Sequence, residues 1–310
     1  MKKPIIFAGA LVFAAIVIIP LVHSQQPPTD TEFTNPQPVT IQGYSGSAEE
    51  PYITPDGQYL IFDSRTDPEK IASKIYYAKK VSDTTFAFMG EVKGVNTNNA
   101  DADLVSIDDT DNFYFFSSRS YHQDFQTIYR GVWNNGTVTG VGPIIGLSDK
   151  EFGMVNVDPE ISADGRALYF SDADFGDFKG DLKNMEVKVA VKNIDGSFTK
   201  LDNSDELRKR TANNHLSGFI GPVFTSHDGL EGFFTRDNPA DNSAHIYIIK
   251  RNSISEPFGM PELVGAADGF VEGQFLSRDG GHLYYHKALG NGSFGIYMLT
   301  RQAVSIPTAP

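Results

Sequence analysis

Acidic side chains recur in this chain at the start of several similar segments. They are Glu49 and Glu50, Asp101 and Asp103, Asp158 and Glu160, and Glu272. Carboxylates that come close together raise one another's pKa, so that one can act as a general acid and another as a base, or they can hold a cation. Glycoside hydrolysis also requires two such groups at a set separation. The same acids could instead serve only as acceptors for backbone amides.

Glu50, Asp103, Asp158 and Glu272 are therefore the first candidates for a ligand-binding site. Three arginines form a second group, because each follows the second strand of its segment. They are Arg65, Arg119 and Arg236. A guanidinium group binds carboxylates and phosphates bidentately. The arginines could bind an anionic ligand, but pairing with the acids is the simpler interpretation.

An acidic loop offers a candidate metal site at Asp172, Asp174 and Asp177. Alternating acids in a loop supply oxygen ligands of the kind that Ca²⁺ prefers. The loop lacks the bidentate glutamate and the spacing of an EF-hand, so a solvated loop is the simpler interpretation. Calcium is the one metal that the sequence suggests, and no organic cofactor is expected, because no phosphate-binding or dinucleotide fingerprint is present.

The segments that must position these residues are copies of one pattern. Five turns mark the copies: Asp56-Gly57, Asp109-Thr110, Asp164-Gly165, Asp228-Gly229 and Asp279-Gly280. A strand rich in aromatic residues follows each turn, and a third strand begins after a polar loop, for example at Ile75 or Ile128. Aromatic and β-branched residues bounded by Gly, Asn and Asp indicate strands between turns. With a fourth strand, each copy is a four-stranded antiparallel meander, the unit of a β-propeller blade.

The fifth copy ends at Arg301 without a fourth strand, and the N-terminus supplies a substitute. Residues 33–39 resemble residues 258–264, the fourth strand of the fourth copy. An N-terminal strand that completes the last blade would close the ring and leave no open edge. The sequence therefore predicts an all-β fold, a five-bladed β-propeller over residues 33–301.

Two kinds of phrase recur in the repeats: Pro51-Tyr-Ile-Thr-Pro-Asp-Gly with Pro159-Glu-Ile-Ser-Ala-Asp-Gly, and Phe-x-Ser-Arg at Phe62 and Phe116. With these phrases, the repeats resemble those of the TolB family of propellers. The resemblance covers about Phe33 to Arg301. It implies the propeller fold and says little about function, because such repeats occur in periplasmic scaffolds, peptidase accessory domains and carbohydrate-active proteins alike.

Loop lengths indicate which face of the disc carries a site. The turns between strands one and two and between strands three and four are short. The loops between strands two and three and the connections between blades are long, and both kinds open on the opposite face. Long loops on one face of a rigid scaffold commonly carry binding sites. The acids at the start of the inner strands would form a funnel on this long-loop face.

The N-terminal residues indicate export. Lys2 and Lys3 precede an apolar run over residues 5–22, which predicts either a cleaved signal peptide over residues 1–24 or a retained inner-membrane anchor. Residues 25–32 are expected to be a linker and residues 302–310 a flexible tail. We expect a periplasmic or secreted protein that contacts membrane only through such an anchor.

The composition limits the kinds of partner and chemistry to be expected. The formal net charge of −13 argues against nucleic acid, which requires a basic face. The absence of cysteine excludes thiolate nucleophiles and disulfides. The first hypothesis for function is a non-catalytic binding module with a protein or glycan partner. The alternative is a glycoside hydrolase that uses two carboxylates of the central funnel.

Overall fold

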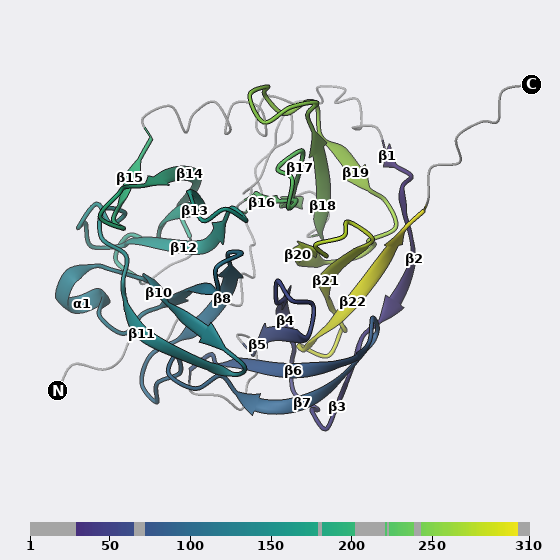
Figure 1. Cartoon of the computed structure of the whole chain (residues 1–310), viewed down its shortest axis with the longest axis horizontal. Coiled ribbons are helices and arrows are strands. Elements are labelled where there is room, and N and C mark those ends of the chain that lie inside the picture. Colours follow the sequence, from purple (N-terminus) through teal and green to yellow (C-terminus); the bar gives the residue numbers. More distant parts are fainter. Residues whose placement is uncertain are drawn as a thin grey trace, which may run out of the picture.

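The computed structural model describes residues 29–64, 72–178, 182–201, 221, 223–238 and 243–302. Their strands form five sheets around a common centre, which confirms the predicted all-β, five-bladed propeller (Figure 1). The innermost strands β4 (Glu49–Ile53), β8 (Ala102–Ile107), β12 (Met154–Ile161), β16 (Phe224–Thr225) and β20 (Val271–Leu276) surround that centre. In these ranges no helix is long and apolar enough to cross a membrane.

Each blade continues outward from its innermost strand. Blade one adds β5 (Tyr59–Asp63), β6 (Ile75–Ser82) and β7 (Thr85–Glu91), and blade two adds β9 (Asn112–Ser117), β10 (Ile128–Asn134) and β11 (Thr137–Pro143). Blade three adds β13 (Ala167–Asp174), β14 (Asn184–Lys192) and β15 (Phe198–Lys200). Blade four adds β17 (Glu231–Asn238), β18 (Ser243–Lys250) and β19 (Glu262–Val264), and blade five adds β21 (His282–Ala288) and β22 (Phe294–Arg301). The short helix α1 (Tyr121–Asp124) follows β9.

The turns that define the repeat are fixed by their own side chains. In four blades a hydroxyl donates to the turn aspartate: Thr54 to Asp56, Ser162 to Asp164, Ser226 to Asp228, and Ser277 to Asp279. Each aspartate also accepts the backbone amide two residues on. This local hydrogen bonding is why the Asp-Gly turns are such strong signals in the sequence.

The ring closes as predicted, through strand β2 (Phe33–Pro38). It pairs antiparallel with β22 and supplies the fourth strand of blade five. Phe33 is buried, and the guanidinium of Arg301 lies 4.6 Å from the centre of its ring. Two short strands that were not predicted add parallel pairs at the outer edges: β1 (Thr29–Asp30) on β19 and β3 (Thr40–Gln42) on β7.

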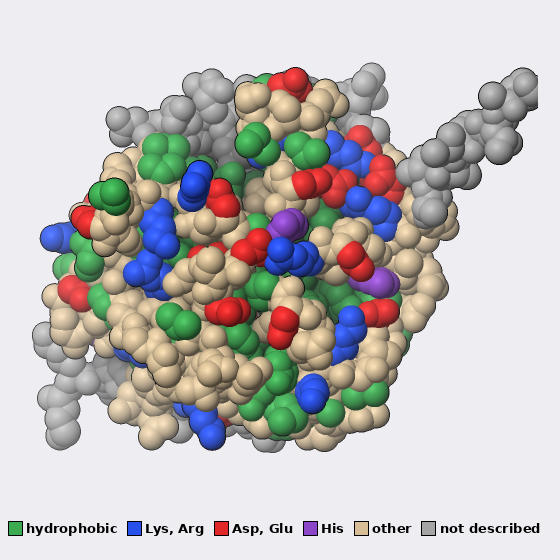
Figure 2. Space-filling model, viewed as in Figure 1, with side chains coloured by type: hydrophobic (Ala, Val, Ile, Leu, Met, Phe, Trp, Pro, Cys, Tyr) green, Lys and Arg blue, Asp and Glu red, His purple; other side chains and the backbone are tan. Residues whose placement is uncertain are grey.

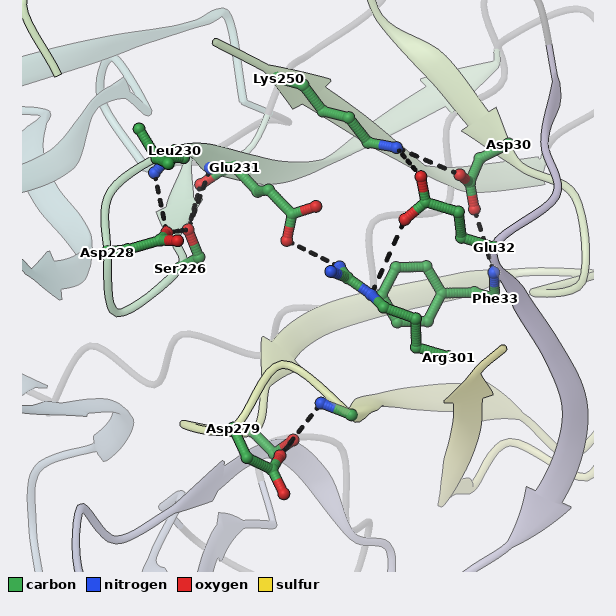
Figure 3. Close-up of polar contacts among 12 residues, drawn as sticks. Asp30, Glu32, Phe33, Ser226, Asp228, Leu230, Glu231, Lys250, Asp279 and Arg301 are labelled. Carbon is green, nitrogen blue, oxygen red and sulfur yellow. Dashed lines mark hydrogen bonds and ion pairs between the residues drawn. The ribbon is translucent and has the colours of Figure 1, made fainter. Parts of the chain in front are cut away.

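Ion pairs join this closure to blade four (Figure 3). Lys250 Nζ lies 2.7 Å from Glu32 Oε1 and 3.6 Å from Asp30 Oδ1, and Arg301 donates to Glu231 Oε2 at 2.6 Å. Residues 29–32 lie in the predicted linker, yet they form β1 and these pairs. The predicted signal or anchor segment and residues 303–310 of the predicted tail lie outside the described residues.

Blade three departs from the prediction. The predicted acidic loop at Asp172, Asp174 and Asp177 is partly strand, because β13 continues to Asp174, and β14 begins at Asn184. The turn between strands three and four, predicted to be short, is long in blade four, because β18 ends at Lys250 and β19 begins only at Glu262. Polar residues at these strand ends resemble loop residues in the sequence. Asp172 is accommodated in its strand, where its carboxylate accepts a hydrogen bond from the side-chain amide of Asn156.

Side chains fill the axis at the middle of the disc. Tyr52 and Phe275 have ring centres 4.4 Å apart, and Phe224 lies 5.0 Å from Phe275. The Tyr52 hydroxyl donates to the carbonyl oxygen of Ile107 at 2.5 Å. Three blades therefore meet in an aromatic layer, which separates the two faces along the axis.

An ion cluster bridges the axis on the face of the short turns. Asp109 of blade two accepts two hydrogen bonds from Arg278 of blade five, at 2.5 and 3.1 Å, and lies 2.9 Å from His227 Nε2 of blade four. Blade two adjoins neither of these blades, so the contacts cross the centre. Acidic, basic and histidine side chains gather near the centre of the view in Figure 2.

We expect Asp109→Asn to lower the melting temperature modestly at neutral pH. Burial works against ionisation of Asp109, but hydrogen bonds and charges from His227 and Arg278 outweigh it and lower its pKa. A lowered pKa stabilises the fold above the unfolded value and loses that effect as the pH falls through the folded value. Thermal melts should therefore converge for the two proteins in strong acid and also approach each other in high salt. An equal difference at every pH would contradict an ionic role.

Candidate functional site

A backbone irregularity recurs where the predicted acids lie. The register of the inner strands shifts in blades one, two, three and five, and one residue at each shift has a positive φ. These residues are Glu50 (47°), Leu104 (55°), Asp158 (53°) and Gly273 (62°). The equivalent residue of blade four, Pro222, lies outside the described residues. Bulges re-aim side chains and are common next to functional sites, and left-handed backbone is costly for residues other than glycine.

Three of the predicted acids come from different blades and surround the long-loop end of the axis. Glu50, Asp158 and Glu272 lie on β4, β12 and β20, and Glu160 lies one bulge deeper on β12. We call these four residues the acidic funnel. The side chains of Glu50 and Glu272 are 17% and 25% exposed, so both are accessible from solvent. Tyr52 of the aromatic layer lies close enough to Glu160 for the glutamate charge to act on its hydroxyl.

Glu160 is an acid of the funnel whose pKa is strongly perturbed. Burial raises its pKa well above 4.5, and the nearby charges of Glu50 and Asp158 raise it further, against a hydrogen bond from Ser106. Its Oε2 atom is buried, and no described group donates to it. The raised pKa favours the protonated form of Glu160 beside Glu50 and Asp158, and a protonated carboxyl group can donate a hydrogen bond.

We expect Glu160→Gln to stabilise the protein at pH 8 by about 1.4 kcal/mol for each unit by which the folded pKa of Glu160 exceeds the unfolded value. The folded pKa lies above the unfolded value, so the glutamate loses stability as the pH rises through the folded value. The glutamine amide avoids this loss and can donate to the neighbouring carboxylates. Denaturant melts should show a gain that disappears below pH 4. A gain in stability that is independent of pH would contradict the assignment of a raised pKa to Glu160.

His286 lies behind the funnel and was not predicted as a site residue. It is fully buried on β21, and its Nδ1 accepts a hydrogen bond from the backbone amide of Glu50 at 3.2 Å. Its Nε2 lies 3.5 Å from Glu272 Oε2. Alignment of the repeats could have found it, because His286 occupies the position of Asp63 in blade one, and Asp63 likewise accepts the amide of Leu104.

The remaining predicted acids serve the structure. Asp103 is 3% exposed, and its Oδ2 accepts a hydrogen bond from Ser73 Oγ at 2.7 Å. Asp101 accepts from the amide and the hydroxyl of the same serine, and the buried Glu49 accepts from Ser47. These three acids therefore accept hydrogen bonds within the protein, which is the alternative to a ligand-binding role given above. Asp103 is not among the accessible acids of the funnel.

Of the three predicted arginines, Arg119 has contacts that hold it between two blades. The Arg119 guanidinium donates to Ser117 Oγ at 3.0 Å and to the carbonyl oxygen of Val95, and lies over the rings of Phe115 and Tyr129. Burial lowers its pKa. These contacts assign Arg119 to packing between blades one and two. Arg236 is buried on β17, and Arg65 lies outside the described residues.

The acidic loop of blade three is divided between a strand and a turn. Asp172 and Asp174 lie on β13, where Lys200 Nζ is 3.6 Å from Asp172 Oδ2. Asp174 accepts the amide of Gly176, and Asp177 is exposed beyond it. Across the described ranges, no group of three or more His, Asp or Glu side chains is arranged to hold a metal ion. Calcium binding at this loop stays a prediction from sequence.

An exposed aromatic ring lies on the long-loop face. Phe152 precedes β12 and is 54% exposed, and its ring lies edge-to-face 5.3 Å from that of Phe178. Beneath them, Tyr121 is buried and its hydroxyl accepts the amide of Gly153 at 2.8 Å. Phe152 is thus held on a packed support. A flat exposed ring of this kind can stack on the apolar face of a sugar.

No protein-family model matches the sequence, and no curated protein matches it. The fold is similar to that of a family 117 glycoside hydrolase from Zobellia galactanivorans, with 12% identity and a TM-score of 0.51 over 87% of this chain and 90% of that one. An endo-arabinase from Bacteroides thetaiotaomicron matches with 13% identity and a TM-score of 0.50 over 89% and 99% of the two chains.

TolB from Acinetobacter baumannii also matches, with 13% identity and a TM-score of 0.40 over 84% of this chain. The match spans 54% of TolB, about half of its length. Solved structures similar to this chain thus include TolB proteins and glycoside hydrolases. At these identities the likeness to the two glycoside hydrolases shows the fold alone.

Proposed function

We propose that this chain is an exported binding module that takes a glycan in the acidic funnel, without hydrolysing it. The observation that carries the proposal is the convergence of Glu50, Asp158 and Glu272 from three blades, with Glu160, whose Oε2 atom is buried, close to Glu50 and Asp158. Carboxylates accept hydrogen bonds from sugar hydroxyls, and a few polar groups among apolar side chains are typical of ligand sites. The exposed Phe152 ring on the same face supports a sugar ligand.

The negative charge of the protein limits the class of glycan that the funnel is expected to bind. The chain carries a formal net charge of −13, and the funnel is lined by carboxylates. Acidic glycans would be repelled, so we expect neutral or amine-bearing oligosaccharides. A protein ligand remains the other outcome of the test.

A hydrolase is the second candidate, and one observation favours it. Glu160 has a raised pKa beside two carboxylates, as a general acid requires. The burial of its Oε2 atom argues against the role, because a general acid must come within hydrogen-bonding distance of the leaving oxygen.

Thermal melts with xylohexaose, arabinohexaose, mannohexaose and an acidic hexagalacturonate test the proposal. A ligand at 100 times its Kd adds about 2.7 kcal/mol of stability. We expect a shift with a neutral hexasaccharide and no cleavage of it by chromatography. Cleavage that Glu160→Gln abolishes would establish the hydrolase. No shift with any hexasaccharide would contradict the glycan proposal and favour a protein ligand.

A further inference from the structure

We propose that His286 is a positioning residue of the acidic funnel, one that couples the orientation of the Glu50 carboxylate to the protonation of its own ring. The consequence for ligands rests on the proposed function, whereas the coupling itself does not. The proposal starts from the place of His286 in the repeat. The equivalent residues of the five blades, by strand register, are Asp63, Phe116, Ser171, Thr235 and His286.

Two of these residues hold the bulge of the next blade through the same bond. Asp63 Oδ2 accepts the amide of Leu104 at 3.1 Å, and His286 Nδ1 accepts the amide of Glu50 at 3.2 Å. The amide belongs in each case to the residue with positive φ. Of the five equivalent residues, all within the described part of the chain, only the histidine titrates near neutral pH.

The hydrogen bond specifies the tautomer. An Nδ1 atom that accepts an amide carries no proton, so the neutral ring holds its proton on Nε2, which faces Glu272 Oε2 at 3.5 Å. Gly273 packs tightly against this arrangement. A Cβ atom there would lie 2.7 Å from His286 Nδ1 and 2.6 Å from Glu50 Oε2. The three residues therefore have little room to rearrange except through the Glu50 side chain.

Protonation at Nδ1 removes the acceptor for the Glu50 amide. The nearest new partner is the carboxylate of the same residue, whose Oε1 lies 3.9 Å away. The charged groups that face the ring are Glu49 and Glu50 of β4 and Glu272 of β20, whereas β22 presents the uncharged ring of Phe294, 5.0 Å away. Burial opposes the charge, but these three carboxylates raise the pKa of His286.

Two arrangements of Glu50 follow. With neutral His286, the imidazole holds the Glu50 backbone and leaves the carboxylate to its other contacts in the funnel. With charged His286, the imidazolium draws the carboxylate out of the funnel toward itself. Ligand affinity in the funnel should therefore rise with pH through the His286 transition, by about tenfold for one hydrogen bond to a charged group.

Two variants test the roles of the His286 Nδ1 and Nε2 atoms separately. In His286→Asn, the amide oxygen can replace Nδ1 and nothing titrates. In His286→Gln, the longer side chain can replace Nε2 toward Glu272 but loses the Glu50 amide. We expect His286→Asn to bind the hexasaccharide found in the thermal screen with wild-type affinity at high pH and without the pH dependence. His286→Gln should bind it about tenfold more weakly at every pH.

Nuclear magnetic resonance of the whole chain, labelled with ¹⁵N-histidine and ¹⁵N-glutamate, tests the coupling without a ligand. We expect the Nε2–H tautomer at high pH, and an amide signal of Glu50 that shifts with the same midpoint as His286. An Nδ1–H tautomer, or a Glu50 signal that ignores the His286 transition, would overturn the proposal. If His286 and Glu50 titrate together but no hexasaccharide binds, the coupling between them is upheld and the proposed function is contradicted.

Discussion

A chain that begins at residue 39 is expected not to fold as a monomer, whereas a chain that begins at Thr29 is expected to fold. The longer chain keeps β1 and β2, and the shorter one loses the outer strand of blade five. Loss of the buried Phe33 ring alone should cost about 3–5 kcal/mol. The lost ladder with β22 and the lost partners of Arg301 and Lys250 add to it, which approaches the 5–15 kcal/mol that stabilises a typical domain.

Circular dichroism and size-exclusion chromatography of the two chains test this expectation. The shorter chain should aggregate, or form oligomers through the open edge of β22, because an unpaired strand edge is a template for another chain. A monomeric chain from residue 39 with the melting temperature of the longer chain would show that the closure contributes little.

Gly273→Ala is expected to destabilise the protein by about 2–5 kcal/mol. The backbone is left-handed there (φ 62°), and a Cβ atom would come within 2.6 Å of a Glu50 carboxylate oxygen and 2.7 Å of the His286 ring. The estimate combines about 1–2 kcal/mol for the backbone conformation with about 1–3 kcal/mol for overpacking. Displacement of Glu50 should also weaken ligand binding.

Gly57→Ala is the matched control. Gly57 has a similar φ of 70°, and nothing lies within 4 Å of a Cβ atom placed on it. This variant should show the conformational cost alone. Denaturant unfolding measures both variants. Equal losses for the two would mean that the crowding by Glu50 and His286 has no energetic consequence.

The propeller could be predicted from sequence because its turns are local. The hydroxyl that precedes each Asp-Gly turn binds the aspartate, and the aspartate binds an amide two residues on, for example Ser226 with Asp228 and Leu230. No distant residue is needed. The N-terminal closure was also predictable, since residues 33–39 repeat a strand pattern that the last copy lacks.

The site was predictable only in part, because distant contacts decide which acids are accessible. Glu50, Asp158 and Glu272 line the funnel, but Asp103 is turned to Ser73, a residue of the neighbouring blade. Arg119 follows its strand as predicted and yet packs against aromatic rings. Position in the repeat gives the end of the blade on which a side chain lies. It does not give the neighbour that the side chain contacts.

The most direct test of the central claim is calorimetric titration of a neutral hexasaccharide into three proteins. They are the wild type, the variant Glu50→Gln with Asp158→Asn, and Asp109→Asn, which removes a charge near the same axis on the opposite face. If the acidic funnel is the site, the double variant should bind at least tenfold more weakly, a loss of about 1.4 kcal/mol or more, and Asp109→Asn should bind as the wild type does. Unchanged binding by the double variant would show that the ligand does not occupy the funnel.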